Sequence, residues 1–129
     1  MEVRVYYEDT DTAGVVYHSN YLNFMERART ELFRSHGLSV AKMAADGFIF
    51  PVVKIEVLFK YPAVHDDLLL ITTTPLKVSG SSFMLRQQVL RQPDKKLIVD
   101  AAVTLACINA SGRPKRIPLE ISTFLKNRL

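Results

Sequence analysis

The sequence predicts an α+β domain in which one long helix packs against a mostly antiparallel sheet. Two observations support this fold class. Apolar residues recur every three or four positions between about residues 20 and 36, which is the spacing of an amphipathic helix. Further along the chain, apolar and polar residues alternate in several segments, the pattern of half-buried strands. The chain has 129 residues, of which 48% are hydrophobic, so we expect one domain over 1–129 with a sizeable core.

The helix is predicted over about residues 20–36. Its apolar stripe comprises Tyr21, Leu22, Met25, Ala28, Leu32 and Phe33. Ser19 or Asn20 is expected to cap the first turn, because short polar side chains accept hydrogen bonds from the free N–H groups there. Gly37 suits the left-handed position that commonly ends a helix, and Leu38 suits the apolar contact beside it.

Five segments are predicted to form strands. They cover residues 2–8, 53–61, 68–78, 82–92 and 97–110, with short helices expected at 39–46 and 119–127. Pro75 indicates an edge position or a bulge, because proline has no N–H to donate. In the last strand Leu97, Val99, Ala101, Val103, Leu105 and Cys107 are expected on one face, and Ile98, Ala102, Ala106 and Ile108 on the other. One helix covers only one face of a sheet, so we expect a partner subunit to cover part of the second face.

Composition narrows the possible functions. The net charge of +4 suits an anionic small molecule, but Lys and Arg are spread along the chain, which argues against nucleic-acid binding. A single cysteine, Cys107, makes no internal disulfide, and no Cys/His spacing indicates a metal site. The N-terminus has no secretory pattern, and no apolar run reaches the ~18–20 residues of a membrane span. We therefore expect a cytoplasmic protein.

Residues 8–18 carry the clearest chemical signal. Three carboxylates, Glu8, Asp9 and Asp11, crowd into four positions, and a tight turn at Gly14 then leads into the predicted helix. A helix N-terminus offers free N–H donors that stabilise a developing oxyanion. A carboxylate beside them can attack a thioester carbonyl or activate water, and a thiol of pKa ~8.5 leaves without a strong general acid. The residues alone also allow a structural interpretation without catalysis. In that case Asp9 and Asp11 form the turn or are solvated, and His18 is a capping or partly buried histidine.

Two motifs carry a family resemblance. They are Tyr6-x-Glu8-Asp9-Thr10-Asp11-x-x-Gly14-Val15-Val16-Tyr17-His18-x-x-Tyr21, followed by Glu26-Arg27-Ala28-Arg29, and later Gly112-Arg113-Pro114-x-Arg116-Ile117-Pro118. Together they resemble the signature of the YbgC branch of the hydroxybenzoyl-CoA thioesterase-like hotdog family. The resemblance implies an antiparallel sheet of five to six strands wrapped around one long central helix. It also implies dimers, usually paired into tetramers, that hydrolyse acyl-CoA at the dimer interface. CoA is then part of the substrate, and no separate cofactor is expected.

The resemblance assigns roles to residues of the first motif. Asp11 matches the catalytic carboxylate, and both direct attack and activation of water stay open for it. The His18 backbone N–H matches the donor that polarises the thioester carbonyl, and its side chain is expected to orient water or Asp11. The acyl entrance is expected to be lined by Gly14, Val15, Val16 and Tyr17. Tyr6 is expected either to orient the loop or to serve as a core or interface tyrosine.

Other charged residues receive weaker assignments. Arg86, Lys115 and Arg116 are candidates for binding the CoA phosphates, since phosphates favour mobile or bidentate cations at a surface. Glu26 is expected to pair with Arg29 or Thr30, and Glu31 with Arg27 or Arg34, at helical spacing. Cys107 is interpreted as a small core residue.

Two other functions compete with thioester hydrolysis. A hotdog hydratase or dehydratase pairs a histidine with a carboxylate, as Asp11 and His18 allow, but the proline-flanked histidine motif of acyl-carrier-protein dehydratases is absent. A non-catalytic acyl-CoA binding module is the second alternative, although a carboxylate beside a thioester serves binding poorly. Relatives of the YbgC branch are also associated with acyl carrier protein and with the Tol-Pal system, so acyl carrier protein is an expected partner.

Overall fold

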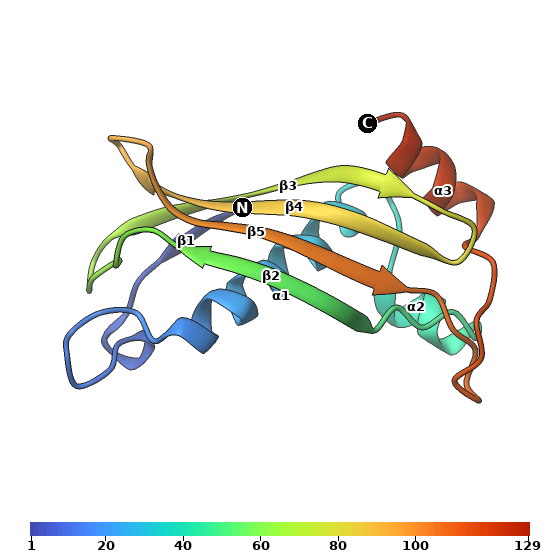
Figure 1. Cartoon of the computed structure of the whole chain (residues 1–129), viewed down its shortest axis with the longest axis horizontal. Coiled ribbons are helices and arrows are strands. Elements are labelled where there is room, and N and C mark those ends of the chain that lie inside the picture. Colours follow the sequence, from blue (N-terminus) through green and yellow to red (C-terminus); the bar gives the residue numbers. More distant parts are fainter.

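In the computed structural model, which describes residues 1–129, a five-stranded antiparallel sheet curves over one long helix (Figure 1). The strands are β1 (Glu2–Arg4), β2 (Val52–Phe59), β3 (Leu68–Val78), β4 (Ser82–Gln92) and β5 (Lys96–Ala106). Their order in the sheet is β1-β3-β4-β5-β2, so β2 lies at one edge. The helices are α1 (His18–Arg34), α2 (Val40–Ala45) and α3 (Leu119–Lys126). The predicted α+β class and hotdog architecture are confirmed.

Helix α1 lies against one face of the sheet because its apolar stripe is buried there. Tyr21, Phe24, Met25, Ala28 and Phe33 are buried, and they pack on the inward-facing side chains of β3, β4 and β5. Burial of this many large side chains stabilises the helix far more than its intrinsic propensity does, at about 1.5–3 kcal/mol for each side chain that is fully buried. Leu22, which was placed in the stripe, is 38% exposed.

The ends of α1 agree only partly with the prediction. Gly37 has the predicted left-handed backbone, with φ of 76°, and the Leu38 N–H donates to the Phe33 carbonyl at 3.0 Å. The predicted cap at Ser19 or Asn20 is wrong, because the helix already begins at His18 and neither residue lies at the N-cap position. The Asn20 side chain instead donates to Asp9 in the preceding loop.

Strand β1 is shorter than the predicted segment 2–8. It ends at Arg4, and Tyr7–Asp9 form a turn of 3₁₀ helix, labelled η1. The Asp9 carboxylate accepts the Tyr6 N–H at 2.8 Å, and the Thr10 hydroxyl donates to the Tyr7 carbonyl at 2.7 Å. These local side-chain bonds compete with sheet pairing and turn the chain away from the strand.

Two irregularities in the sheet bear on the other predictions. A bulge lies between Pro75 and Lys77 in β3, as the proline indicated. A second register shift, where β4 meets β5, brings both Ile98 and Val99 into the core with no exposed surface. The prediction that Ile98 faces away from Val99 is therefore wrong, because a bulge interrupts the alternation of side chains. The last strand also ends at Ala106, not at residue 110.

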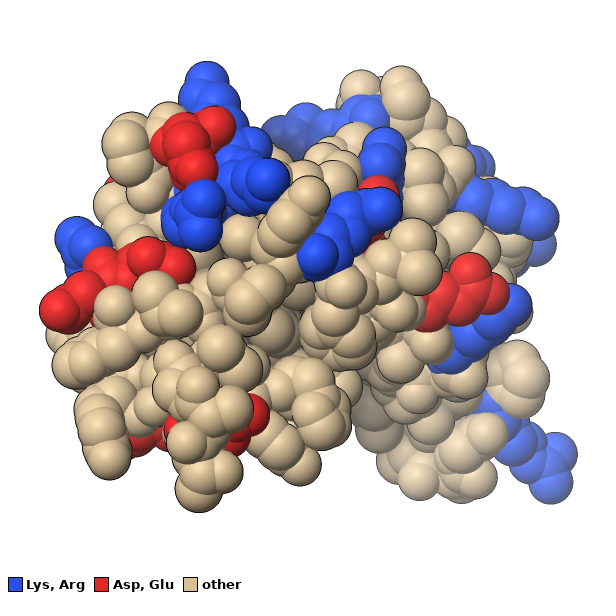
Figure 2. Space-filling model, turned by 60° about the vertical axis from the view of Figure 1, so that its left-hand side comes forward, with Lys and Arg blue, Asp and Glu red and all other residues tan.

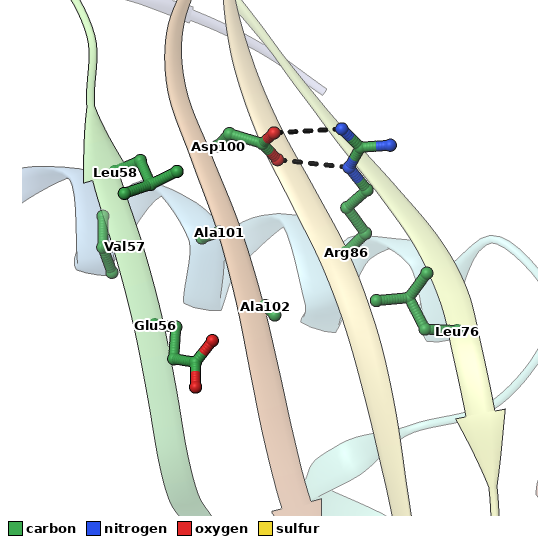
Figure 3. Close-up of a pocket in the computed structure, with 8 residues that line it drawn as sticks. All are labelled: Glu56, Val57, Leu58, Leu76, Arg86, Asp100, Ala101 and Ala102. Atoms are coloured by element: carbon green, nitrogen blue, oxygen red, sulfur yellow. Dashed lines mark hydrogen bonds and ion pairs between the residues drawn. The ribbon is translucent and has the colours of Figure 1, made fainter.

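The sheet face that does not contact α1 is hollowed at its centre (Figure 3). The hollow has a volume of about 530 Å³, and its walls include Leu58 of β2, Leu76 of β3 and Ala102 of β5. In this chain no helix covers it (Figure 1). Among the helices, none combines the length and the apolar character that a membrane crossing requires.

Candidate functional site

The loop between β1 and α1 holds Asp11 at the head of a tight turn. The Asp11 N–H donates to the Val15 carbonyl at 2.9 Å, and the Gly14 N–H donates to the Asp11 carbonyl at 2.9 Å. The turn requires a left-handed residue at Gly14, whose φ is 81°. The Asp11 Oδ1 accepts the Ala13 N–H at 2.8 Å, which orients the carboxylate. The second carboxylate oxygen has no hydrogen-bond partner within the chain.

The three carboxylates of this segment have different surroundings. Asp9 has a structural role: its Oδ2 accepts the Tyr6 N–H at 2.8 Å and its Oδ1 accepts the Asn20 side-chain amide at 3.0 Å. Glu8 is exposed to solvent and makes no hydrogen bond. Asp11 is therefore the carboxylate of the three that is both held in place and open to a ligand.

The N-terminus of α1 presents free donors beside this turn. The Tyr17 N–H is occupied by the Asp9 carbonyl at 3.0 Å, and the Asn20 N–H by the Tyr17 carbonyl at 2.9 Å. The N–H groups of His18 and Ser19 donate to no group of the chain. These orphan N–H groups carry the partial positive charge of the helix terminus.

Asp11 and His18 line the same cleft, which has a volume of about 320 Å³. Its other walls are Val15, Val16, Tyr21, Phe59, Lys60, Tyr61 and Pro62. The His18 ring lies 4.3 Å from the Tyr17 ring and 6.2 Å from the Phe59 ring, measured between centroids. The Tyr21 hydroxyl accepts the Ala63 N–H at 3.2 Å, and burial raises the pKa of this tyrosine. The phenol therefore stays neutral and fixes the wall of the cleft to α1.

The structure brings together part of the set predicted from the sequence. Asp11, His18, Val15 and Val16 meet in the cleft, whereas Tyr6, Gly14 and Tyr17 do not line it. Tyr6 is 60% exposed, so the core interpretation of this tyrosine is wrong for the isolated chain. Gly14 shapes the turn, and Tyr17 stacks on His18 from outside the cleft.

Sequence reasoning missed the second wall of the cleft. This wall is formed by the segment Phe59–Pro62, where β2 ends, and by Tyr21, which belongs to the first motif but received no site role from the sequence. The sequence carries no local signal for this wall, because Phe59 and Tyr61 fit the alternating pattern of the strand predicted over 53–61. In the structure both side chains are about half exposed. Exposed aromatic residues next to a carboxylate loop are typical of a ligand site.

The three basic residues predicted to bind phosphate lie outside this cleft. Arg86 projects from the outer sheet face and donates from Nε and Nη2 to the two carboxylate oxygens of Asp100 at 3.1 and 2.9 Å (Figure 3). Lys115 and Arg116 line a separate polar hollow of about 280 Å³ near the turn between β3 and β4. The Lys115 Nζ lies 3.8 Å from the Phe48 ring centroid and 3.2 Å from the Gly47 carbonyl oxygen.

The glutamates of α1 lie apart from the cleft. Glu31 pairs with Arg34, one of its two predicted partners. Glu26 forms neither an ion pair with Arg29 nor a hydrogen bond with Thr30, its two predicted partners, so that prediction is wrong. Arg29 instead donates to the Oε1 of the fully buried Gln87 at 2.9 Å, and burial lowers the pKa of its guanidinium. The pairing failed because Arg29 faces the sheet and not the helix surface.

Cys107 is buried in the core as predicted, and burial raises the pKa of its thiol. A buried thiol that is poorly ionised is a weak nucleophile. No group of three or more His, Cys, Asp or Glu side chains is arranged to hold a metal ion. Asp11 and His18 supply a carboxylate and an imidazole to one cleft, which are residue types that acid–base chemistry uses.

The chain belongs to the thioesterase-like superfamily, whose family model matches residues 5–127. Among its relatives, the acyl-CoA thioester hydrolase YbgC of Escherichia coli O6:H1 is 39% identical over 125 residues, which cover 96% of this chain and 92% of YbgC.

Solved structures support the same relationship. A probable thioesterase from Bartonella henselae is 38% identical with a TM-score of 0.86, and the match covers 92% of this chain and 97% of that protein. A 1,4-dihydroxy-2-naphthoyl-CoA thioesterase from Synechocystis is 26% identical with a TM-score of 0.92, covering 98% and 94% of the two chains. The chain is thus an enzyme of the thioesterase class with the fold of these proteins.

Proposed function

We propose that this protein hydrolyses acyl-CoA thioesters, releasing free CoA and a carboxylic acid. The observation that carries the proposal is the meeting of three features in one cleft: an oriented carboxylate, free N–H donors at a helix N-terminus, and apolar walls. The substrate class, acyl-CoA thioesters, comes from the names of relatives such as YbgC. The proposed reaction, attack on the thioester carbonyl, comes from the carboxylate and the N–H donors.

In the proposed reaction, the thioester carbonyl oxygen points at the N-terminus of α1. The N–H of His18 donates to this oxygen, and the Ser19 N–H is the other unoccupied donor there. As the carbonyl carbon is attacked, negative charge develops on the oxygen, and each well-placed donor stabilises it by about 3–4 kcal/mol. The carbon–sulfur bond then breaks, and CoA leaves as a thiolate that takes up a proton from water.

Asp11 acts on the carbonyl carbon from the other side. Either its free carboxylate oxygen attacks directly, giving an anhydride that water hydrolyses, or it takes a proton from a water molecule that attacks. The Ala13 N–H holds the carboxylate in one orientation for either role. The His18 imidazole, held between Tyr17 and Phe59, orients the water or Asp11.

The acyl group is proposed to lie against the apolar walls of the cleft. Val15 and Val16 form one wall, and Phe59 with Tyr21 forms the other. Tyr6, Gly14 and Tyr17 shape or border the loop and are proposed to act indirectly. Walls that are both aliphatic and aromatic accept either a short aliphatic or an aromatic acyl group, which a substrate panel separates.

The enzyme is proposed to act as a homo-oligomer in the cytoplasm. Strand β2 is an edge strand, and Val53, Leu58 and Phe59 on it are exposed, which suits pairing with β2 of a second copy. Such a dimer would extend the sheet and bring partner residues beside the cleft. The hollowed outer face of the sheet suits further pairing into a tetramer. Acyl carrier protein remains a proposed partner, and the single reduced cysteine suits a reducing compartment.

The decisive experiment compares the wild type with Asp11→Asn on a panel of acyl-CoAs, following release of free thiol. Asn keeps the shape of the side chain and removes its charge and basicity. We expect a loss of kcat of about a hundredfold or more, the scale of a lost acid–base group. Glu8→Gln is the matched control, since it removes an exposed carboxylate three residues away and should keep full activity. Equal turnover by Asp11→Asn and the wild type would refute the assignment.

A further inference from the structure

Two lysines without carboxylate partners border the Asp11 cleft. Lys60 lines the cleft just after β2. Lys96 begins β5, and its Nζ lies 3.7 Å from the ring centroid of Tyr61, which also lines the cleft. The ion pairs of the chain involve neither lysine. The two ammonium groups are therefore available to an anionic ligand.

Two acidic residues near this corner are paired with arginines. Asp94, in the turn between β4 and β5, pairs with Arg91 at 2.7 Å, and Asp100 pairs with Arg86 at 2.9 Å. These arginines hold the pKa of both carboxyl groups below the usual value. Lys60 adds a weaker charge interaction with Asp100, and neither Lys60 nor Lys96 forms an ion pair with a carboxylate. Figure 2 shows Lys and Arg side chains across the upper part of one face, with acidic side chains among them.

The rim is held to the sheet by backbone hydrogen bonds. The N–H groups of Lys60 and Tyr61 both donate to the Ile98 carbonyl, at 2.8 and 3.3 Å. The position of Lys96 above the Tyr61 ring adds a cation–π contact. The side chains thus extend from backbone whose position is set by β5, which favours a defined binding site over a diffuse positive surface.

We propose that Lys60, which precedes Tyr61 in the chain, and Lys96, which lies over the Tyr61 ring, hold the phosphate groups of the CoA substrate where its nucleotide end leaves the cleft. This inference rests on the proposed function. A cleft of about 320 Å³ is at the lower end of the range for small-molecule sites, ~300–1,000 Å³, so it holds the acyl thioester and leaves the nucleotide outside. Lysine, a compact and mobile charge, suits phosphates that lie at the rim of a site.

The same geometry separates these lysines from the cations that the sequence suggested. Arg86 has both its Nε and Nη2 groups engaged by Asp100. Lys115 lies on the Phe48 ring and binds the Gly47 carbonyl, and it lines a different hollow. Within one chain, Lys60 lines the cleft that contains Asp11, and Lys96 contacts Tyr61, another residue of its lining.

The test measures kcat/KM for an acyl-CoA and for the N-acetylcysteamine thioester of the same acid, which has the thioester but no phosphates. The variants are Lys60→Ala, Lys96→Ala and the double variant. Lys95→Ala is the matched control for Lys96, because it removes an equal charge one residue away. Lys54→Ala, on β2 and outside the lining of the cleft, is the control for Lys60. We divide kcat/KM for the acyl-CoA by kcat/KM for the N-acetylcysteamine thioester. This ratio should fall about fivefold in each single variant, the effect of losing one partly exposed charged contact. The ratio should fall further in the double variant and stay at the wild-type value in both controls.

A direct measurement of CoA binding separates failure of the proposed function from failure of the proposed phosphate site. Calorimetry with CoA itself should show weaker binding to the double variant, and this measurement needs no turnover. If neither thioester is hydrolysed by the wild type, the proposed function fails, while the calorimetry still decides the phosphate site. If both are hydrolysed and the ratio is unchanged in the double variant, the rim assignment is wrong. If the ratio instead falls in Lys115→Ala or Arg86→Ala, those residues and not Lys60 and Lys96 bind the phosphates.

Discussion

The carboxylate of Asp9 binds the side-chain amide of Asn20 at 3.0 Å and thereby ties the loop carrying Asp11 to the first turn of α1. The same carboxylate accepts the Tyr6 N–H, so one side chain joins the segment that follows β1, the loop and the helix. In the proposed reaction the loop supplies Asp11 and the helix supplies the oxyanion donors. Their relative position therefore depends on this bond.

Replacing Asn20 with Ala should reduce both kcat and stability. The loss of one partly buried hydrogen bond to a charged group costs about 1–3 kcal/mol, and a small displacement of Asp11 from the helix N-terminus lowers the rate directly. We expect kcat to fall about tenfold and Tm to drop by several degrees, measured by thiol release and thermal unfolding. Asn23→Ala, at an exposed position on the same helix, is the control and should change neither quantity. An unchanged kcat in Asn20→Ala would show that the tie does not set the geometry.

Gly14→Ala should strain the turn that holds Asp11. A Cβ at this position meets no atom within 4 Å, so the effect comes from the left-handed backbone, with φ of 81°, and not from a clash. We expect a destabilisation of about 1 kcal/mol and a lower kcat, because the strain is relieved by moving the loop. Gly80→Ala is a suitable comparison, since it also has open space and lacks the left-handed φ. Chemical denaturation and kcat measurements of both variants test this; equal behaviour would contradict the strain argument.

Gln87 should be the most sensitive polar residue in the core. It is fully buried, donates to the Met25 carbonyl and the Thr73 hydroxyl at 2.9 Å each, and accepts from Arg29. Gln87→Leu leaves the Arg29 guanidinium partly buried without this acceptor, at a cost of about 2–4 kcal/mol in the free energy of unfolding. Chemical denaturation measures that cost. The double variant Arg29→Leu/Gln87→Leu should be more stable than the sum of the single changes predicts, because it removes both partners. Simple additivity would show that the two side chains are not coupled.

The Arg86–Asp100 pair should make a small contribution to stability that depends on pH. Arg86 lowers the pKa of Asp100 below its unfolded value of about 4, so the folded state favours the charged carboxylate. The stabilisation is complete above the unfolded pKa and is lost as pH falls through the lower folded pKa. The difference in unfolding free energy between wild type and Asp100→Asn should therefore shrink from pH 7 to pH 3. Denaturation curves at the two pH values measure it. A difference that grows on acidification would contradict the sign of the shift.

Much of the architecture was predictable because it depends on local periodicity. The buried stripe through Tyr21, Met25 and Ala28 predicted the long helix, and the bounds of β3 and β4 agree with the alternating pattern. The misses occurred where one contact overrides the pattern. The Asp9 carboxylate ended β1 early, and a bulge turned Ile98 into the core. A local side-chain hydrogen bond and a β-bulge leave the hydrophobic periodicity of the sequence almost unchanged. Neither can therefore be predicted from that periodicity.

The sequence by itself determined the fold class, the helix and the carboxylate segment, because these depend on residues close together along the chain. Only the tertiary structure decided what faces Asp11. The segment Phe59–Pro62 lies about fifty residues away along the chain, and antiparallel pairing of β2 with β5 carries it to the N-terminus of α1. Tertiary structure also decided which charges form ion pairs, since Arg86 of β4 pairs with Asp100 of β5, whereas Lys60 and Lys96 form no ion pair. Charge pairing and cleft walls are contacts between distant residues, and these form only once the sheet is assembled.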